Sequence, residues 1–162
     1  MIDRPSRDKL AIALRQYVSG RITNDDLDDI DVDWRDRGAL AVKERAWCLY
    51  DDTYQHKAVG KHYLPRPARG EIGRWILFLH ADLEYTWPEF SFHQIVNWPM
   101  NFLTFGWWER SKQRRFNEFM AAGDFSVWPF VARQDYDKAL RHPRYLSGQQ
   151  APVAADPPQA GR

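Results

Sequence analysis

The segment that decides the fold is ARGEIGRWILFLHADL, residues 68–83. Its large apolar side chains recur at three- and four-residue intervals, which is the spacing of one face of an α-helix. They are Ile72, Trp75, Ile76, Phe78, Leu79 and Leu83. Because Phe78 widens this face, we expect neighbours to cover the helix on more than one side. The segment therefore predicts a helix at the centre of the fold.

A helical hairpin is predicted at the N-terminus. Apolar residues recur with helical spacing over 6–17, and Gly20 follows where a helix would end. Thr23 or Asn24 can then cap a second, shorter helix, because their side chains accept hydrogen bonds from free N–H groups in the first turn. Two helices joined by so short a turn form a hairpin.

The rest of the chain predicts one long helix and little other regular structure. Residues 36–56 have helical spacing, and we expect this helix to form the central pair with the helix at 68–83. Residues 125–131 are compatible with a short strand that Pro129 interrupts, and 135–141 with one or two helical turns. We therefore predict a mainly α fold: a small helical domain with an N-terminal helical hairpin and at most one short strand near the C-terminus.

Composition divides the chain into three parts. Residues 1–30 hold the helical hairpin as a small module, and residues 31–146 form a helical, aromatic-rich core domain. Residues 147–162 contain three prolines, two glycines and no aromatic side chain, so they predict a disordered tail.

Charge and cysteine content exclude several classes of protein. The 23 Lys and Arg nearly balance the 22 Asp and Glu, so the net charge of +1 argues against general nucleic-acid binding. The single cysteine, Cys48, has no partner for an intrachain disulfide or a paired-cysteine metal site. The N-terminus is too polar for a secretory signal. We therefore expect a cytoplasmic protein that is at most peripheral to the inner membrane.

Two resemblances bear on the family. The segment LRQYVSGRITNDDLDD resembles the two-helix unit of SHOCT-like modules, although Asn24 and Asp25 stand where that unit more often has paired glutamates. The whole chain resembles an uncharacterised family of small bacterial proteins, through SGRITNDD, AWCLYDD, RWILFLHADLEYTWP and GDFSVWPF. The resemblance implies a bacterial origin and no particular activity.

A metal site is one hypothesis for an enzyme. Asp52 and His56 are four residues apart in one predicted helix, and His80 and Glu84 are four apart in or beside the other. Two such pairs on facing helices supply four nitrogen and oxygen ligands. The same spacing arises by chance, and His80 next to an apolar run is typical of a core-edge histidine. We expect no cofactor and keep a metal-dependent enzyme as the alternative.

Other chemical motifs point away from catalysis. Asp29, Asp31 and Asp33 match the first calcium-ligand positions of an EF-hand loop, but Trp34 stands where that loop requires glycine. Cys48 lies between bulky residues, where a cysteine usually packs as a small buried hydrophobe. The chain has no phosphate-binding loop, dinucleotide fingerprint, nucleophile elbow or zinc-protease motif.

Two segments have the composition of binding surfaces. The first is acidic and runs from Asp25 to Asp33, with Asp25, Asp26 and Asp29 as its candidate contacts. The second, at 98–115, combines aromatic and basic residues, which are enriched at protein interfaces and at membrane surfaces. Its candidate contacts are Trp98, Trp107, Trp108, Arg110, Arg114 and Arg115.

These observations favour a non-enzymatic protein that binds a protein partner, or a second copy of itself, through one of the two surfaces. The alternative to protein binding is weak contact of residues 90–115 with a membrane surface. We do not expect a nucleic-acid partner.

Overall fold

In the part of the chain that the computed structural model describes, residues 1–51, 53–88 and 107–144, the protein is helical. The α-helices are α1 (Arg4–Val18), α2 (Asn24–Asp28), α3 (Arg37–Ala46), α4 (Arg66–Leu79), α6 (Trp107–Ala121) and α7 (Arg133–Arg141). Single 3-10 turns are η1 (Trp47–Leu49), η2 (Gly60–His62) and η4 (Phe125–Val127). The predicted mainly α fold is confirmed.

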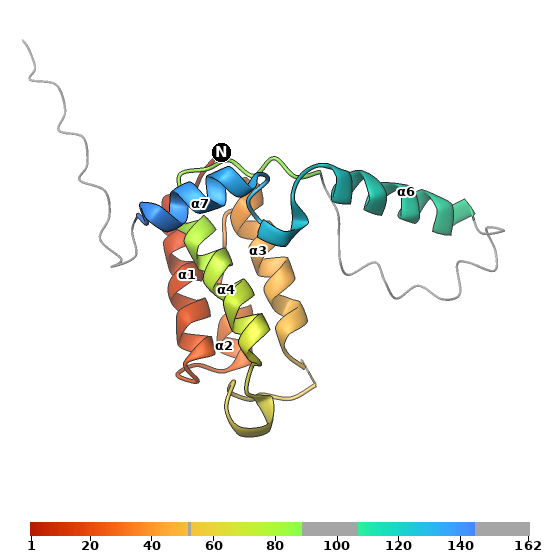
Figure 1. Cartoon of the computed structure of the whole chain (residues 1–162). Coiled ribbons are helices and arrows are strands. Elements are labelled where there is room, and N and C mark those ends of the chain that lie inside the picture. Colours follow the sequence, from red (N-terminus) through yellow and green to blue (C-terminus); the bar gives the residue numbers. More distant parts are fainter. Residues whose placement is uncertain (52, 89–106, 145–162) are drawn as a thin grey trace, which may run out of the picture.

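Helix α4 is the centre of the fold, as its apolar face predicts. It packs against α1, α3 and α7, and its contact with α1 is the most extensive of the three. Figure 1 shows α1, α4 and α3 side by side, with α7 crossing one end of them and α6 extending away from the body. The prediction that the second central helix is the one at 36–56 is wrong, because α1 contacts α4 more extensively than α3 does.

Aromatic side chains fill the core. Trp75 of α4 meets Trp128 edge to face at 5.8 Å between ring centroids, and Phe78 meets Phe130 at 5.4 Å. Trp87 is fully buried, and its indole N–H donates to the carbonyl of Pro129 at 3.0 Å. These contacts join α4 to the segment after α6, so residues far apart in sequence share one core.

The N-terminal hairpin forms as predicted, with α1 starting earlier than expected. Asp3, and not Ser6, caps α1, because its carboxylate accepts a hydrogen bond from the Ser6 N–H. Gly20 adopts a positive φ of 70° in the turn. Thr23 then caps α2 in a reciprocal capping box with Asp26.

The long helix predicted at 36–56 ends ten residues early, at Ala46. After the turn η1 the backbone becomes extended at Tyr50. The buried amide of Asn24 donates to the carbonyl oxygens of Asp51 and Tyr54. Its oxygen accepts from the N–H of His56 at 2.7 Å. These contacts hold Asp51, Tyr54 and His56 against the start of α2, which is incompatible with a continuing helix.

The short strand predicted at 125–131 is also wrong. Asp124 accepts hydrogen bonds from the backbone and hydroxyl of Ser126, and this cap starts the 3-10 turn η4 instead. The only β pairing among the described residues is an isolated bridge between Thr23 and Lys57.

Helix α1 contributes to the same buried cluster as α4, through Leu10, Leu14 and Tyr17. The division of the chain near residue 30 remains a prediction. The predicted tail at 147–162 lies outside the described residues.

Candidate functional site

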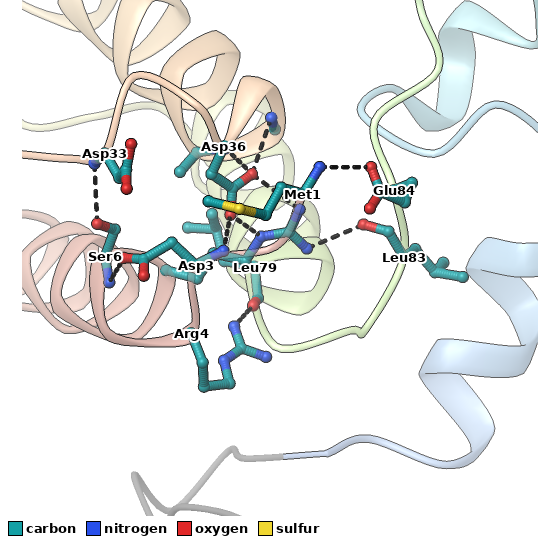
Figure 2. Close-up of polar contacts among 12 residues, drawn as sticks. Met1, Asp3, Arg4, Ser6, Asp33, Asp36, Leu79, Leu83 and Glu84 are labelled. Atoms are coloured by element: carbon teal, nitrogen blue, oxygen red, sulfur yellow. Dashed lines mark hydrogen bonds and ion pairs between the residues drawn. The ribbon is translucent and has the colours of Figure 1, made fainter.

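A buried ion pair joins three segments at one end of the helices. Arg7 of α1 and Asp36 at the start of α3 are fully buried and bond through two parallel contacts. The distances are 2.7 Å from Nε to Oδ2 and 3.0 Å from Nη2 to Oδ1. Arg7 Nη1 also donates to the carbonyls of Ala81 and Leu83, both at 3.0 Å. Figure 2 shows Asp36 among the contacts that surround this pair.

The Asp36 carboxylate is completely satisfied. It accepts from the N–H groups of Asp3, Gly38 and Ala39, in addition to the two bonds from Arg7. Burial alone raises the pKa of Asp36, but the hydrogen bonds and charge of Arg7 and the backbone donors outweigh it and lower the pKa. The two charges therefore neutralise each other within the fold, and the Asp36 carboxylate accepts five hydrogen bonds from the chain itself.

His80 lies at the end of α4 in a second polar cluster. Its ring is 1% exposed, and Nε2 lies 3.0 Å from Nη2 of Arg15. Because arginine only donates, Nε2 must accept, and the proton sits on Nδ1, 3.6 Å from the carboxylate of Asp8. Burial, followed by the charge of Arg15, lowers the pKa of His80 to about 4. His80 is thus a neutral structural histidine near pH 7.

The structure overturns the geometry of the predicted metal site. His56 is not on a helix, and its ring stacks on His62 at 4.1 Å between centroids. Glu84 follows α4 and binds the N-terminal ammonium of Met1 at 2.9 Å. Asp52 lies outside the described residues. Within the described ranges, no group of three or more His, Cys, Asp or Glu side chains is arranged to hold a metal ion.

Cys48 is exposed, contrary to the expectation that it is buried. The cause is again the early end of α3, since Cys48 belongs to the turn η1 and not to a packed helix face.

The acidic segment forms an exposed surface. We use the name acidic surface for the solvent-facing residues of α2 and the loop after it: Asp25, Asp26, Asp28, Asp29, Asp31 and Trp34. Leu27 and Asn24 turn inward and anchor α2, so the aspartates between them face solvent. The Thr23 backbone and hydroxyl lower the pKa of Asp26 by donating to its carboxylate.

Trp34 is the most exposed large apolar side chain of the described residues, at 74%. Trp75, Trp87 and Trp128, in contrast, are each less than 5% exposed. The neighbouring Arg35 guanidinium lies 5.9 Å from the Trp34 ring centroid and pairs with Asp33 at 3.0 Å. The acidic surface therefore ends in an aromatic side chain that the core does not cover.

The aromatic-basic segment is described only in part. Trp98 lies outside the described residues, and the side chains of Trp107, Trp108 and Arg110 at the start of α6 are also outside the description. Arg114 and Arg115 are exposed, and Arg114 pairs with Glu118 at 3.3 Å within the helix. Near the far end of α6, the buried side chain of Phe119 packs on Trp87.

The sequence did not indicate that Arg7 and Asp36 form a buried ion pair, or that Trp34 is exposed beyond the acidic segment. Arg7 lies one turn before Leu10 on the apolar face of α1, and a charged residue on such a face signals a buried partner. Its partner Asp36 is the N-cap of α3. An aspartate before a helical pattern predicts where the helix starts, but it does not predict an ion pair with Arg7.

Comparison with protein-family models, with curated proteins and with solved structures found no match. Within the described part of the chain, no helix has the length and apolar character needed to span a bilayer.

Proposed function

We propose that this chain is a non-enzymatic interaction protein of the bacterial cytoplasm, and that it binds a basic segment of a protein partner through the acidic surface. The observation that carries the proposal is the exposure of Trp34 at 74%, three residues after Asp31, the last of the exposed aspartates. Exposure of a tryptophan ring to water is unfavourable for the free protein. Burial of the same ring in an interface therefore contributes strongly to the free energy of binding.

Charge complementarity selects the partner. The acidic surface presents five exposed carboxylates over seven residues, which attract lysine and arginine side chains and accelerate encounter at low salt. Trp34 then offers its ring face for cation–π contact with a lysine or arginine of the partner, the geometry that Arg35 already adopts toward it.

The test is capture from the host, measured by native mass spectrometry of the full chain purified without chelator. Two variants address the acidic surface: Trp34→Ala, and the paired change Asp28→Asn with Asp29→Asn. The matched control is Arg114→Gln with Arg115→Gln, which changes two exposed charges of the opposite sign on α6.

We expect one stoichiometric partner to be lost from both acidic-surface variants and retained by the α6 control. Increasing salt should weaken the complex, because exposed charges are screened within about 10 Å at 0.1 M salt. Loss of the partner from the α6 variant alone would assign partner binding to the 98–115 segment. An unchanged complex in all three variants would refute both surfaces.

A further inference from the structure

The loop at residues 53–65, together with the first turn of α4, forms a basic surface. Residues 53–70 contain four lysine and arginine residues and no aspartate or glutamate. None of these four cations forms an ion pair with a carboxylate of the described residues. Figure 1 shows the loop at the end of α1 and α4 opposite to α7. We define the basic surface by its exposed residues Tyr54, Lys57, Lys61, Tyr63, Arg66 and Arg69.

Two tyrosine rings lie among the cations of the basic surface. The Lys61 ammonium is 5.3 Å from the ring centroid of Tyr54, and the Arg69 guanidinium is 5.4 Å from that of Tyr63. The two tyrosines are themselves 44% and 56% exposed. Tyrosine and arginine are enriched at the energetically important positions of protein interfaces. The basic surface therefore combines positive charge with aromatic area that the core does not cover.

His62 reports the positive field within the loop. Its ring stacks on that of His56, and its Nε2 lies 2.9 Å from the hydroxyl of Tyr54. Desolvation, followed by the positive charges of His56 and Lys61, lowers the pKa of His62. Asp51, at the start of the loop, opposes this shift and does not reverse it. The cations therefore outweigh the nearest carboxylate, and the loop favours a negatively charged partner.

The basic surface adjoins the acidic surface. An isolated β-bridge between Thr23 and Lys57 joins the loop to the start of α2. The ammonium group of Lys57 also donates to the carbonyl of Arg21 at 3.3 Å. After the hydrogen bonds from Thr23, the charge of Lys57 contributes to the lowered pKa of Asp26. Two surfaces of opposite charge therefore lie next to each other.

This adjacency selects among negatively charged partners. A nucleic acid or an anionic membrane presents phosphate groups over a wide area, so it would bring negative charge against the acidic surface as well. A protein surface that carries the two charges in the reverse order attracts both surfaces. A second copy of this chain, related by a two-fold rotation, has this order, because the same contact is then made twice.

We propose that two copies of this chain form a two-fold dimer, in which the basic surface of each copy binds the acidic surface of the other. The inference rests on the proposed function, because it names a second copy as the source of the basic segment that the acidic surface binds. The exposed rings of Tyr54 and Tyr63 supply apolar area, and the cations around them meet carboxylates. Exposed ion pairs each contribute little, so we expect a weak dimer with a Kd of about 1–100 μM.

The experiment is sedimentation velocity of the purified full chain, which needs no other protein. Between about 1 and 300 μM chain at low salt, the population should change from monomer to dimer. Raising the salt to about 0.5 M should return it to monomer, because exposed charges are then screened. In the capture experiment, the partner would have the mass of the chain itself.

Two charge-reversal variants test the contact. Lys61→Glu with Arg69→Glu reverses the basic surface, and Asp28→Lys with Asp29→Lys reverses the acidic surface. Each variant alone should dimerise at least about tenfold more weakly, because like charges then face each other. An equimolar mixture of the two variants should form a heterodimer, since each reversed surface then meets a surface of opposite charge. This rescue also shows that both variants are folded.

The matched control is Lys138→Glu with Arg141→Glu, which reverses two exposed cations on α7, at the opposite end of the helices. It should dimerise as the unchanged chain does. Three results would overturn the proposal: a monomer up to about 300 μM, well above the expected Kd; a dimer that survives reversal of either surface; and no heterodimer in the mixture.

Two further outcomes separate this inference from the proposed function. A chain that stays monomeric but loses a host partner in its acidic-surface variants would overturn the dimer and leave the proposed function in place. Binding of a monomer to a single-stranded oligonucleotide or to anionic vesicles, abolished by Lys61→Glu with Arg69→Glu, would also overturn the dimer. It would assign the basic surface to phosphate groups.

Discussion

The buried Arg7–Asp36 pair makes a sharp prediction for stability. Asp36→Asn keeps the size of the side chain and the oxygen that can accept from Gly38, Ala39 and Arg7 Nη2. It removes the charge and replaces Oδ2, the acceptor for Arg7 Nε and the Asp3 N–H, with an amide that donates. The arginine charge then stays buried without a counter-charge.

Removing one partner of a buried ion pair typically costs about 3–5 kcal/mol. The whole free energy of unfolding of a domain is about 5–15 kcal/mol, so this loss is a large share of it. With a urea m-value of about 2 kcal/mol per molar, the unfolding midpoint should fall by about 2 M. Tryptophan fluorescence reports the transition, since Trp75, Trp87 and Trp128 are buried.

The control is Glu118→Gln, which breaks the exposed pair with Arg114 and should change the free energy of unfolding by less than about 0.5 kcal/mol. Arg7→Met with Asp36→Asn completes a double-mutant cycle. The double variant should be less destabilised than the sum of the two single variants, because neither charge is left alone. A loss below about 1 kcal/mol for Asp36→Asn, or additive effects in the cycle, would refute the reasoning.

Three further predictions concern the core. Gly38→Ala should destabilise by about 1–3 kcal/mol in urea unfolding, because its Cβ would lie 2.9 Å from side-chain atoms of both α1 and α4, whereas Gly73→Ala, which meets open space, should stabilise by up to about 1 kcal/mol. The pKa of His80 is lowered from 6.5 to about 4, so between these pH values the unfolded chain binds a proton that the folded chain does not. The free energy of unfolding should therefore fall by about 3 kcal/mol as the pH drops from 6.5 to about 4. His80→Gln should lack this contribution to the pH dependence of stability. Phe119→Ala should cost about 3–5 kcal/mol by thermal or urea unfolding, while Met120→Ala, at the exposed neighbouring position of the same helix, should cost much less; similar losses would contradict the anchoring of α6 by Phe119.

The central helix was predictable because its signal is local. An apolar face at helical spacing is buried wherever the helix docks, so the pattern at 68–83 identified α4 without knowledge of its neighbours. The start of α2 was predictable for the same reason, since both cap candidates, Thr23 and Asn24, lie at its first turn; the structure selects Thr23, which forms a capping box with Asp26.

The features that the sequence did not reveal depend on distant partners. The end of α3 is set by Asn24, whose amide binds carbonyls 27 and 30 residues away. The two-helix arrangement predicted for the metal ligands is contradicted with that helix, because His56 lies beyond the end of α3 and four-residue spacing places two side chains on one face only within a continuous helix. The acidic surface was predictable as a charged segment, but the exposure of Trp34 depends on where the loop after α2 runs.

The Arg7 side chain also constrains the order of events during synthesis. Two of its acceptors, the carbonyls of Ala81 and Leu83, lie 74 and 76 residues further along the chain. During translation, the residues of α1, α2 and α3 therefore leave the ribosome well before these acceptors emerge. Until then, burial of the guanidinium would leave donors unsatisfied, which is costly. The N-terminal hairpin can form its local turns early, but its packing in this core must wait for translation to pass the end of α4.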